Sequence, residues 1–154
     1  MIHYFLNIGS NLGNRKLNIS RALRELEALY GYFEVSKIFE SKPWGFVSEN
    51  DFMNVAVMVV TDKKPEEVLA DILTIEKKLN PSSHRDARGG YADRILDIDI
   101  MAADDIIIDS PQLTVPHRHL AERLFFLKPF AELAPMWKHP ANELTCAEMI
   151  DNLF

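Results

Sequence analysis

Apolar residues in this chain recur at two different periods, and the order of these periods is what most constrains the fold. Four segments have the two-residue or continuous apolar pattern of a β-strand: residues 2–8, 33–39, 52–60 and a segment that starts at Arg94. Two segments repeat apolar residues every three or four positions, as amphipathic helices do: residues 17–30 and 65–79. The order strand, helix, strand, strand, helix, strand predicts an α+β fold, the ferredoxin-like split βαβ sandwich. Its antiparallel sheet carries both helices on one face, so the opposite face is expected to be free for ligands.

Helix-end signals support these boundaries. Gly31 follows the first predicted helix at a place where a left-handed cap is expected. Pro65 stands at the start of the second helix, and Glu66 and Glu67 follow in the turn where the helix dipole favours acids. The remaining predicted segments are a short apolar run and a C-terminal helical extension of two helices: residues 106–108, 121–134 and 146–153.

The segment that starts at Arg94 also carries the strongest chemical signal. Alternation in a strand sends Asp97 and Asp99 to the face opposite its apolar residues. Side chains two residues apart on a strand lie about 6 to 7 Å apart, so the two carboxylates could bind one Mg²⁺ ion or a pair of them. Such a pair fits phosphoryl transfer. An edge strand with a solvated acidic face remains an alternative for this pattern taken alone.

Length, composition and charge narrow the class of protein further. The chain has 154 residues, 47% hydrophobic and 26% charged, and we expect one domain over residues 1–154. Its net charge of −6 argues against general nucleic-acid binding, which needs a basic surface. No apolar run approaches the roughly 20 residues of a membrane span, and we expect no signal peptide. The single cysteine, Cys146, cannot form an internal disulfide, which favours the cytoplasm. We expect a monomer without membrane partners.

Two irregular loops contain further candidate ligand-binding residues. The loop 40–51 contains Trp44 beside proline and glycine, and an aromatic residue in such a loop either stacks on a flat ligand or folds back over the core. The loop 80–93 is long for a connection without periodicity and contains Arg85 and Arg88. These arginines could fold over a polyphosphate, although a mobile polar loop without a task is the more frequent case.

Two histidines follow further along the chain. His117 and His119 are spaced for one face of an extended segment. A zinc site would need further ligands, and neither a cysteine nor a clustered third ligand accompanies them. A phosphate contact or simple exposure is therefore favoured over zinc.

Three motifs occur in the following order along the chain: Gly9-Ser10-Asn11-Leu12-Gly13, then Gly90-Tyr91-Ala92-Asp93-Arg94 leading into Leu96-Asp97-Ile98-Asp99-Ile100, then Leu113-Thr114-Val115-Pro116-His117 followed by Arg123 and Phe125. Each motif is weak alone, but their joint occurrence at these separations is highly specific. Together they resemble the 6-hydroxymethyl-7,8-dihydropterin pyrophosphokinase family of folate biosynthesis. The resemblance implies an enzyme that binds ATP and two Mg²⁺ ions and transfers pyrophosphate to the hydroxymethyl group of the pterin, releasing AMP.

The resemblance also implies roles for individual residues. Asp97 and Asp99 would bind the Mg²⁺ ions, and Arg85 and Arg94 would join them as catalytic residues. The residues expected to bind the pterin are Ser41, Pro43, Trp44, Gly45, Phe52, Asn54 and Phe125, with Phe52 and Phe125 stacked on the ring. The residues expected to bind ATP are Glu76, Arg85, Arg94, Ile100, Thr114, His117 and Arg123.

Two other functions share parts of this pattern. A palm-like nucleotidyl transferase also has a ferredoxin-like sheet with two metal-binding carboxylates, so the fold alone does not exclude it. A non-catalytic RNA-binding module could use aromatic residues on the sheet. The acidic pair, the negative net charge and the lack of an aromatic-basic consensus speak against this second alternative.

Overall fold

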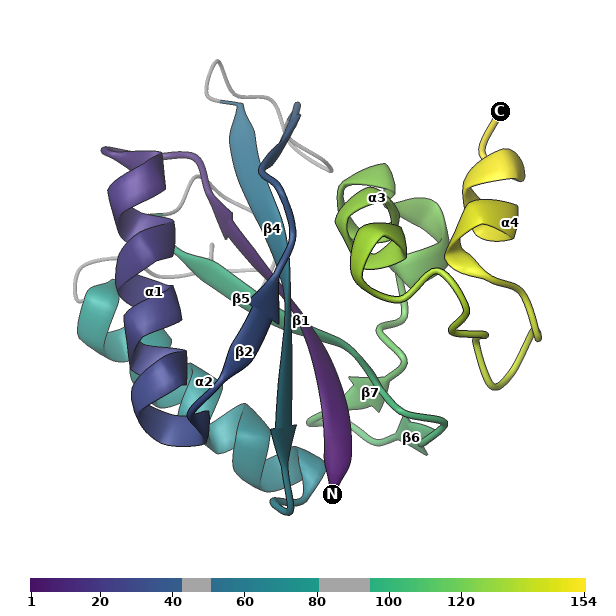
Figure 1. Ribbon diagram of the computed structural model, residues 1–154, viewed down its shortest axis with the longest axis horizontal. Helices are drawn as coiled ribbons and strands as arrows, with labels where there is room; N and C mark the ends of the chain where they lie inside the picture. The colour runs from purple at the N-terminus through teal and green to yellow at the C-terminus, as the bar shows by residue number, and fades with distance from the viewer. Residues whose placement is uncertain (43–50, 81–94) are drawn as a thin grey trace.

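The computed structural model describes residues 1–42, 51–80 and 95–154, and its centre is an antiparallel sheet (Figure 1). Five strands form this sheet within the described residues: β1 (Ile2–Ser10), β2 (Phe33–Val35), β3 (Phe39–Ser41), β4 (Phe52–Thr61) and β5 (Asp97–Ala103). Their order is β2-β4-β1-β5, and β3 also pairs with β4. The protein is therefore an α+β protein in which the two long strands, β1 and β4, lie side by side at the centre.

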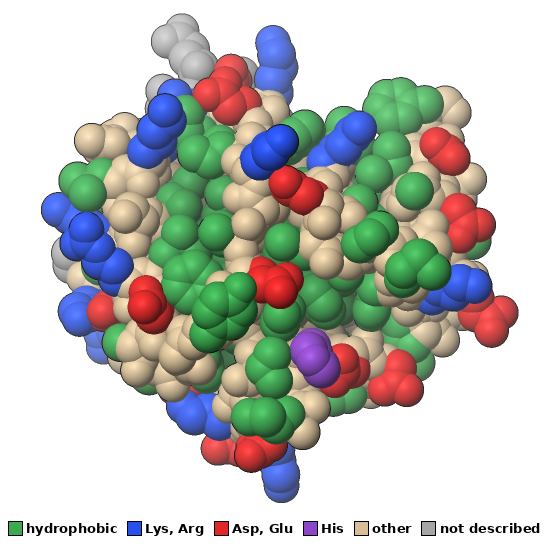
Figure 2. Space-filling model, viewed as in Figure 1, with side chains coloured by type: hydrophobic (Ala, Val, Ile, Leu, Met, Phe, Trp, Pro, Cys, Tyr) green, Lys and Arg blue, Asp and Glu red, His purple; other side chains and the backbone are tan. Residues whose placement is uncertain are grey.

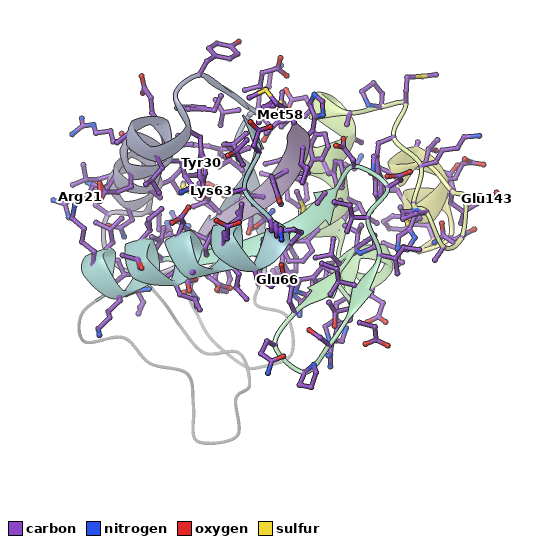
Figure 3. All side chains as sticks on the ribbon, turned by 90° about the horizontal axis from the view of Figure 1, so that it is seen from below. Arg21, Tyr30, Met58, Lys63, Glu66 and Glu143 are labelled. Carbon is purple, nitrogen blue, oxygen red and sulfur yellow. The ribbon has the colours of Figure 1, made fainter. Side chains whose placement is uncertain are left out.

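Two helices cover one face of the sheet: α1 (Arg15–Tyr30) and α2 (Pro65–Leu79) (Figure 1). Tyr4, Leu6 and Ile8 alternate along β1 and point into the core beneath these helices. Pro65 occupies the first turn of α2, as predicted. Gly31 follows α1 with a positive φ of +80°, but its ψ of −129° differs from that of the predicted left-handed cap. Lys63 and Tyr30 lie together beside α2 (Figure 3), where the Tyr30 hydroxyl donates to Asp71 over 2.6 Å.

The opposite face of the sheet is not free, contrary to the prediction. A 3-10 turn, η1 (Leu120–Glu122), leads into α3 (Leu124–Leu133), and α4 (Cys146–Asp151) packs beside them (Figure 1). These elements form a second apolar core with β1, in which the rings of Phe5 and Phe130 stack at 4.7 Å. The apolar stripe of the C-terminal helices must be buried against a partner, and the only large face left is this one. A ligand that binds this face of the sheet must therefore use the end that α3 leaves open.

The predicted strand over residues 33–39 is interrupted. The backbone N–H of Ser36 donates to the carbonyl of Ala56, but the N–H of Ala56 donates to the Ser36 hydroxyl instead of its carbonyl. The side chain thus replaces one bond of the ladder, and the strand divides into β2 and β3. A continuous apolar pattern gives no sign of such a replacement.

The remaining predictions hold with small shifts of the boundaries. The apolar run at 106–108 leads into a small hairpin of β6 (Ile108–Asp109) and β7 (Thr114–Val115). The helix predicted at 121–134 is observed as η1 followed by α3, and the last helix ends at Asp151. β5 begins at Asp97, while Arg94 lies outside the described residues.

Surface charge is unevenly distributed on the face shown in Figure 2, with basic side chains frequent over α1 and acidic ones frequent over the C-terminal segment. Hydrophobic side chains reach the surface between them, and Val35 and Ile38 near the sheet edge are among the exposed residues. No helix in the described part of the chain is both long and apolar enough to cross a membrane.

Candidate active site

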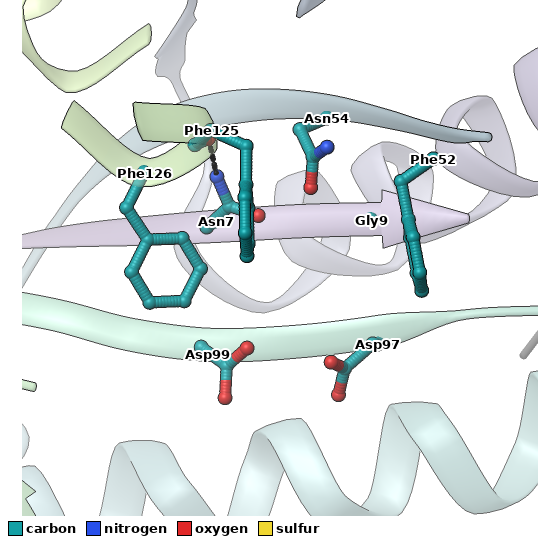
Figure 4. A pocket seen from close by; sticks show the side chains of 8 residues that line it. All are labelled: Asn7, Gly9, Phe52, Asn54, Asp97, Asp99, Phe125 and Phe126. Carbon is teal, nitrogen blue, oxygen red and sulfur yellow. Dashed lines mark hydrogen bonds between the residues drawn. The ribbon is translucent and has the colours of Figure 1, made fainter. Parts of the chain in front are cut away.

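A pocket opens on the sheet face beside the first turn of α3, with an empty volume of about 290 Å³ including its mouth. Its lining comes from β1, β4, β5 and α3: Asn7, Gly9, Phe52, Asn54, Asp97, Asp99, Phe125 and Phe126 (Figure 4). Each strand contributes residues two apart, because only alternate side chains point to this face. We call this space the slot.

Two phenylalanine rings form the walls of the slot. Figure 4 shows Phe52 and Phe125 edge-on, with a gap between them above Gly9. Phe126 packs against Phe125 edge to face, with ring centroids 5.0 Å apart. The guanidinium carbon of the buried Arg123 lies 5.6 Å from the ring centroid of Phe125 and 5.0 Å from that of Phe126. The wall on α3 is therefore held from behind, and the side chains of Phe52 and Phe125 bound the gap on two sides.

The floor of the slot depends on a glycine. Gly9 lies opposite Asn54 in the β1–β4 ladder, and a Cβ atom at Gly9 would stand 2.8 Å from the Asn54 amide oxygen. The same Cβ would stand 3.4 Å from the ring of Phe52. The Asn54 amide nitrogen donates to the hydroxyl of Ser41 over 3.0 Å, which orients its oxygen. Ser41, Phe52 and Asn54, all predicted to bind the pterin, are thus brought together.

Asp97 and Asp99 line the same slot from β5, as the alternation predicts. Asp97 pairs with Gly9 and Asp99 with Asn7 in the ladder, while Ile98 between them points into the helix-side core. Asp97 is 5% exposed, so its carboxylate is held within the protein instead of projecting from an acidic surface. This burial argues against the alternative of an edge strand with a solvated acidic face, because a buried carboxylate is retained only with compensating partners.

His117 lies next to this acidic pair. Its Nε2 atom is 3.7 Å from Oδ1 of Asp99, and its Nδ1 atom accepts a hydrogen bond from the backbone N–H of His119. Because Nδ1 is an acceptor, a neutral ring carries its proton on Nε2, the atom that faces the slot. The described residues contain no group of three histidine, cysteine or acidic side chains placed to hold a metal, so zinc is not supported there.

The other predicted ATP-binding residues are more dispersed. The Glu76 carboxylate accepts from the backbone N–H of Ile98 over 2.8 Å and joins α2 to β5. The side chain of Ile100 is buried in the helix-side core, so a ligand contact there would use its backbone. The Thr114 hydroxyl is buried and has no hydrogen-bond partner in the described part of the chain. Predicted residues outside the described ranges are Pro43, Trp44, Gly45, Arg85 and Arg94, together with most of the loop 80–93.

Three lining residues, Asn7, Gly9 and Phe126, are not among the site residues predicted from the sequence. Asn7 is a polar residue on an apolar strand, and its parity places it on the face opposite Leu6 and Ile8. A polar residue at this position of an apolar strand could have indicated a site residue, because a buried polar side chain in a central strand needs a partner. That partner is the carbonyl of Phe125, 3.0 Å from the amide nitrogen.

The fold and the slot define a class of protein: an α+β protein with a central antiparallel sheet and a pocket in which two aromatic side chains stand beside a pair of carboxylates. A sequence model of the 7,8-dihydro-6-hydroxymethylpterin-pyrophosphokinase family matches residues 5–135. The chain belongs to this family. It is 35% identical over 140 residues to the 2-amino-4-hydroxy-6-hydroxymethyldihydropteridine pyrophosphokinase of Aquifex aeolicus, covering 91% of this chain and 85% of that one. The pyrophosphokinase of Porphyromonas gingivalis is 36% identical over 138 residues, covering 88% and 92%.

Solved structures support the same fold. The HPPK-DHPS of Plasmodium falciparum superposes with a TM-score of 0.72 at 17% identity, covering 99% of this chain. A second HPPK-DHPS structure, solved with substrates, gives a TM-score of 0.74 at 15% identity and covers 98% of this chain. This chain spans 43% of each of those two chains, so it matches one part of them.

Proposed function

We propose that this protein transfers the terminal pyrophosphate of ATP to the hydroxymethyl group of 6-hydroxymethyl-7,8-dihydropterin and releases AMP. The observation that carries this proposal is the slot, in which two flat aromatic walls stand beside Asp97 and Asp99. Membership of the pyrophosphokinase family agrees with it. We propose that the fold is the ferredoxin-like split βαβ sandwich, which the strand order β2-β4-β1-β5 supports, and that residues 1–154 form one pyrophosphokinase domain.

The pterin ring would enter the slot between Phe52 and Phe125. Stacking on two rings suits a flat heterocycle of any polarity, so the walls supply affinity and the polar groups supply orientation. Asn54 and Ser41 are placed to bind the ring edge on the β4 side, where their mutual hydrogen bond fixes the donor and acceptor atoms. The hydroxymethyl group would then point across β1 toward the carboxylates of β5.

The acidic pair fits magnesium. Mg²⁺ prefers oxygen ligands and is commonly held by one or two carboxylates together with substrate phosphates, which matches two aspartates without a third protein ligand among the described residues. Asp97 and Asp99 would hold the metal, and we propose two ions, as in other two-metal phosphoryl transfer sites. Bound Mg²⁺ would neutralise charge on the phosphate oxygens during transfer.

The chain's own groups would mainly position the substrates. In phosphoryl transfer, alignment and charge neutralisation account for most of the catalysis, so a strong general base is not required. The Nε2–H of His117 faces Asp99 and is placed to donate to a phosphate oxygen of ATP. The hydroxyl of Thr114, which has no hydrogen-bond partner within residues 1–42, 51–80 and 95–154, could also donate to the phosphates. Arg85 and Arg94 remain predicted ATP contacts.

We propose a monomer acting on small molecules, and the residues that line the slot in the described part of the chain are consistent with this, since β1, β4, β5 and α3 supply them. A net charge of −6 fits the absence of a nucleic-acid partner. The use of ATP and the buried thiol of Cys146 fit the cytoplasm.

Incubation with MgATP and the reduced pterin alcohol, followed by chromatography, tests the proposal. We expect AMP and a pyrophosphorylated pterin in equal amounts. Free pyrophosphate with a nucleotidyl adduct would instead indicate a nucleotidyl transferase. If neither product forms and the protein binds single-stranded RNA in a strongly salt-dependent manner, the RNA-binding alternative replaces the proposal.

A further inference from the structure

The carbonyl of Phe125 lacks its usual helical partner. In an α-helix the carbonyl of residue i accepts from the N–H of residue i+4, and the residue four positions after Phe125 is Pro129. Proline has no backbone N–H, so this bond of α3 cannot form. The missing bond lies in the first turns of the helix, at the residue whose side chain forms one wall of the slot.

Asn7 supplies the missing donor from the neighbouring strand. Its amide nitrogen lies 3.0 Å from the Phe125 carbonyl oxygen, across 118 residues of sequence. Asn7 is 2% exposed and sits on β1 between Phe5, which packs under α3, and Gly9, which forms the floor of the slot. The side chain therefore ties the wall of the slot to its floor at the point where the helix has lost a bond.

The other end of the Asn7 amide faces the slot. Because the acceptor on Phe125 is a carbonyl, the amide nitrogen must point toward it, which directs the amide oxygen away. In Figure 4 this oxygen lies on the side of Phe125 that faces Phe52 and Gly9. A buried acceptor in this place matches a ligand that carries an N–H group on its edge.

We infer that Asn7 is a specificity-determining residue of the slot: its amide nitrogen holds the Phe125 wall in place of the N–H that Pro129 lacks, and its amide oxygen accepts a hydrogen bond from a ring N–H of the pterin. This inference rests on the proposed function for the identity of the ligand. The dihydropterin carries N–H donors along its edges, whereas the nucleotide is expected on the carboxylate side. Asn7 should thus affect the pterin and leave ATP unaffected.

Four proteins test the inference: wild type, Asn7→Ala, Pro129→Ala and the double variant. We expect Asn7→Ala to raise the pterin KM about tenfold or more, since two hydrogen bonds are lost, and to change the ATP KM less than about twofold. Pro129→Ala restores a helical N–H to the Phe125 carbonyl and by itself should change little. In the double variant, Pro129→Ala should reverse the part of the rise in pterin KM that comes from losing the hydrogen bond to the Phe125 carbonyl. No recovery would overturn the role of the nitrogen, and complete recovery would overturn the role of the oxygen.

Two controls separate this inference from loss of stability and from failure of the proposed function. Tyr30→Phe removes a hydrogen bond on the opposite face of the sheet, so it should lower the Tm without raising the pterin KM. An equal rise of KM in this variant would overturn the inference. The Tm values of the four proteins form a double-mutant cycle that needs no substrate. If wild type makes no AMP, the proposed function fails, while additive Tm changes would separately overturn the tether between Asn7 and Phe125.

Discussion

Single residues reach the slot because of strand parity. Asn7 and Gly9 on β1, Phe52 and Asn54 on β4, and the two aspartates on β5 all point to the face that α3 shares. Since side chains alternate along a strand, a shift of one residue in any of these pairings would send the whole set into the helix-side core. The apolar residues between them prevent this, because they would then face the slot.

The first prediction concerns the acidic pair. We expect Asp97→Asn or Asp99→Asn to lower kcat at least about 100-fold, since each removes a metal ligand whose charge stabilisation is worth several kcal/mol. The Tm should not fall, because the change in volume is small and one of two neighbouring negative charges is removed. AMP formation at saturating Mg²⁺ is the measurement. Asp109→Asn, at an exposed aspartate of β6, is the matched control and should keep wild-type turnover. A near wild-type rate in either slot variant would contradict the metal assignment.

The second prediction concerns the aromatic walls. Phe52→Ala and Phe125→Ala should each weaken pterin binding by about 1 to 3 kcal/mol, a value typical of a base stacked on an aromatic side chain. ATP binding should change much less, because the rings are expected to stack on the pterin while the phosphates of ATP are expected beside the carboxylates of β5. Calorimetry with each ligand separately measures both effects. Tyr32→Ala removes an exposed aromatic ring outside the slot and should leave pterin affinity unchanged. An equal loss for ATP would mean that the two rings only support the core.

Among the elements, α1 and α2 are joined by a polar cluster at the base of the sheet. Asp71 on α2 accepts hydrogen bonds from the Tyr30 hydroxyl at the end of α1 and from Lys63, over 2.6 Å and 2.7 Å (Figure 3). Burial by itself would raise the pKa of Asp71, but the hydrogen bonds from Lys63 and Tyr30 and the charge of Lys63 lower it below its ordinary value. Burial and the same carboxylate raise the pKa of the Tyr30 phenol.

The third prediction follows from this lowered pKa. A carboxyl group whose pKa is lower in the folded than in the unfolded state stabilises the protein above its unfolded pKa, near the ordinary value of 3.8. This stabilisation is lost as the pH falls through the folded pKa. Wild type should therefore lose more stability between about pH 5 and about pH 3 than Asp71→Asn does. Urea unfolding at the two pH values measures the difference. Equal losses in the two proteins would show that the cluster does not contribute to acid stability.

At the scale of the whole molecule, the described residues form two apolar cores, one on each face of the sheet. The helix-side core contains Leu6 and Val57, and the second core joins Phe5 and Met101 to the C-terminal helices. Cys146 at the start of α4 is completely buried in this second core. Burial raises the pKa of its thiol to about 12. The thiol is therefore a probe for the packing of the C-terminal segment on the sheet.

The fourth prediction uses that thiol. At about pH 8 only about one thiol in ten thousand would be ionised, and the thiolate is the reactive form, so a thiol reagent should not label the native protein. One thiol per chain should react after unfolding in guanidinium chloride, since Cys146 is the single cysteine. A second measurement in intermediate denaturant should show labelling in step with the loss of the sheet signal. Rapid labelling of the native protein would mean that α4 opens independently of the sheet.

The sequence by itself determined the type and order of most elements. Periodicity depends on local geometry, because every second residue of a strand and every third or fourth residue of a helix meets the same core. For this reason the strands of residues 2–8 and 52–60 and the helix that starts at Pro65 were predicted from their own residues, as was the common face of Asp97 and Asp99. The family resemblance also came from local information, because each of its motifs is a short run of neighbouring residues.

The tertiary structure alone decided what covers the second face and how the slot is closed. The apolar stripe of residues 124–133 does not say which surface will bury it, and the pattern of residues 33–39 does not reveal that Ser36 replaces a ladder bond. The sequence does not reveal that Asn7 and Pro129 are connected, since a missing helical donor becomes important only when a distant strand supplies another. Contacts of this kind depend on how chain segments far apart in sequence pack together. The periodicity of apolar residues within one segment carries no information about that packing.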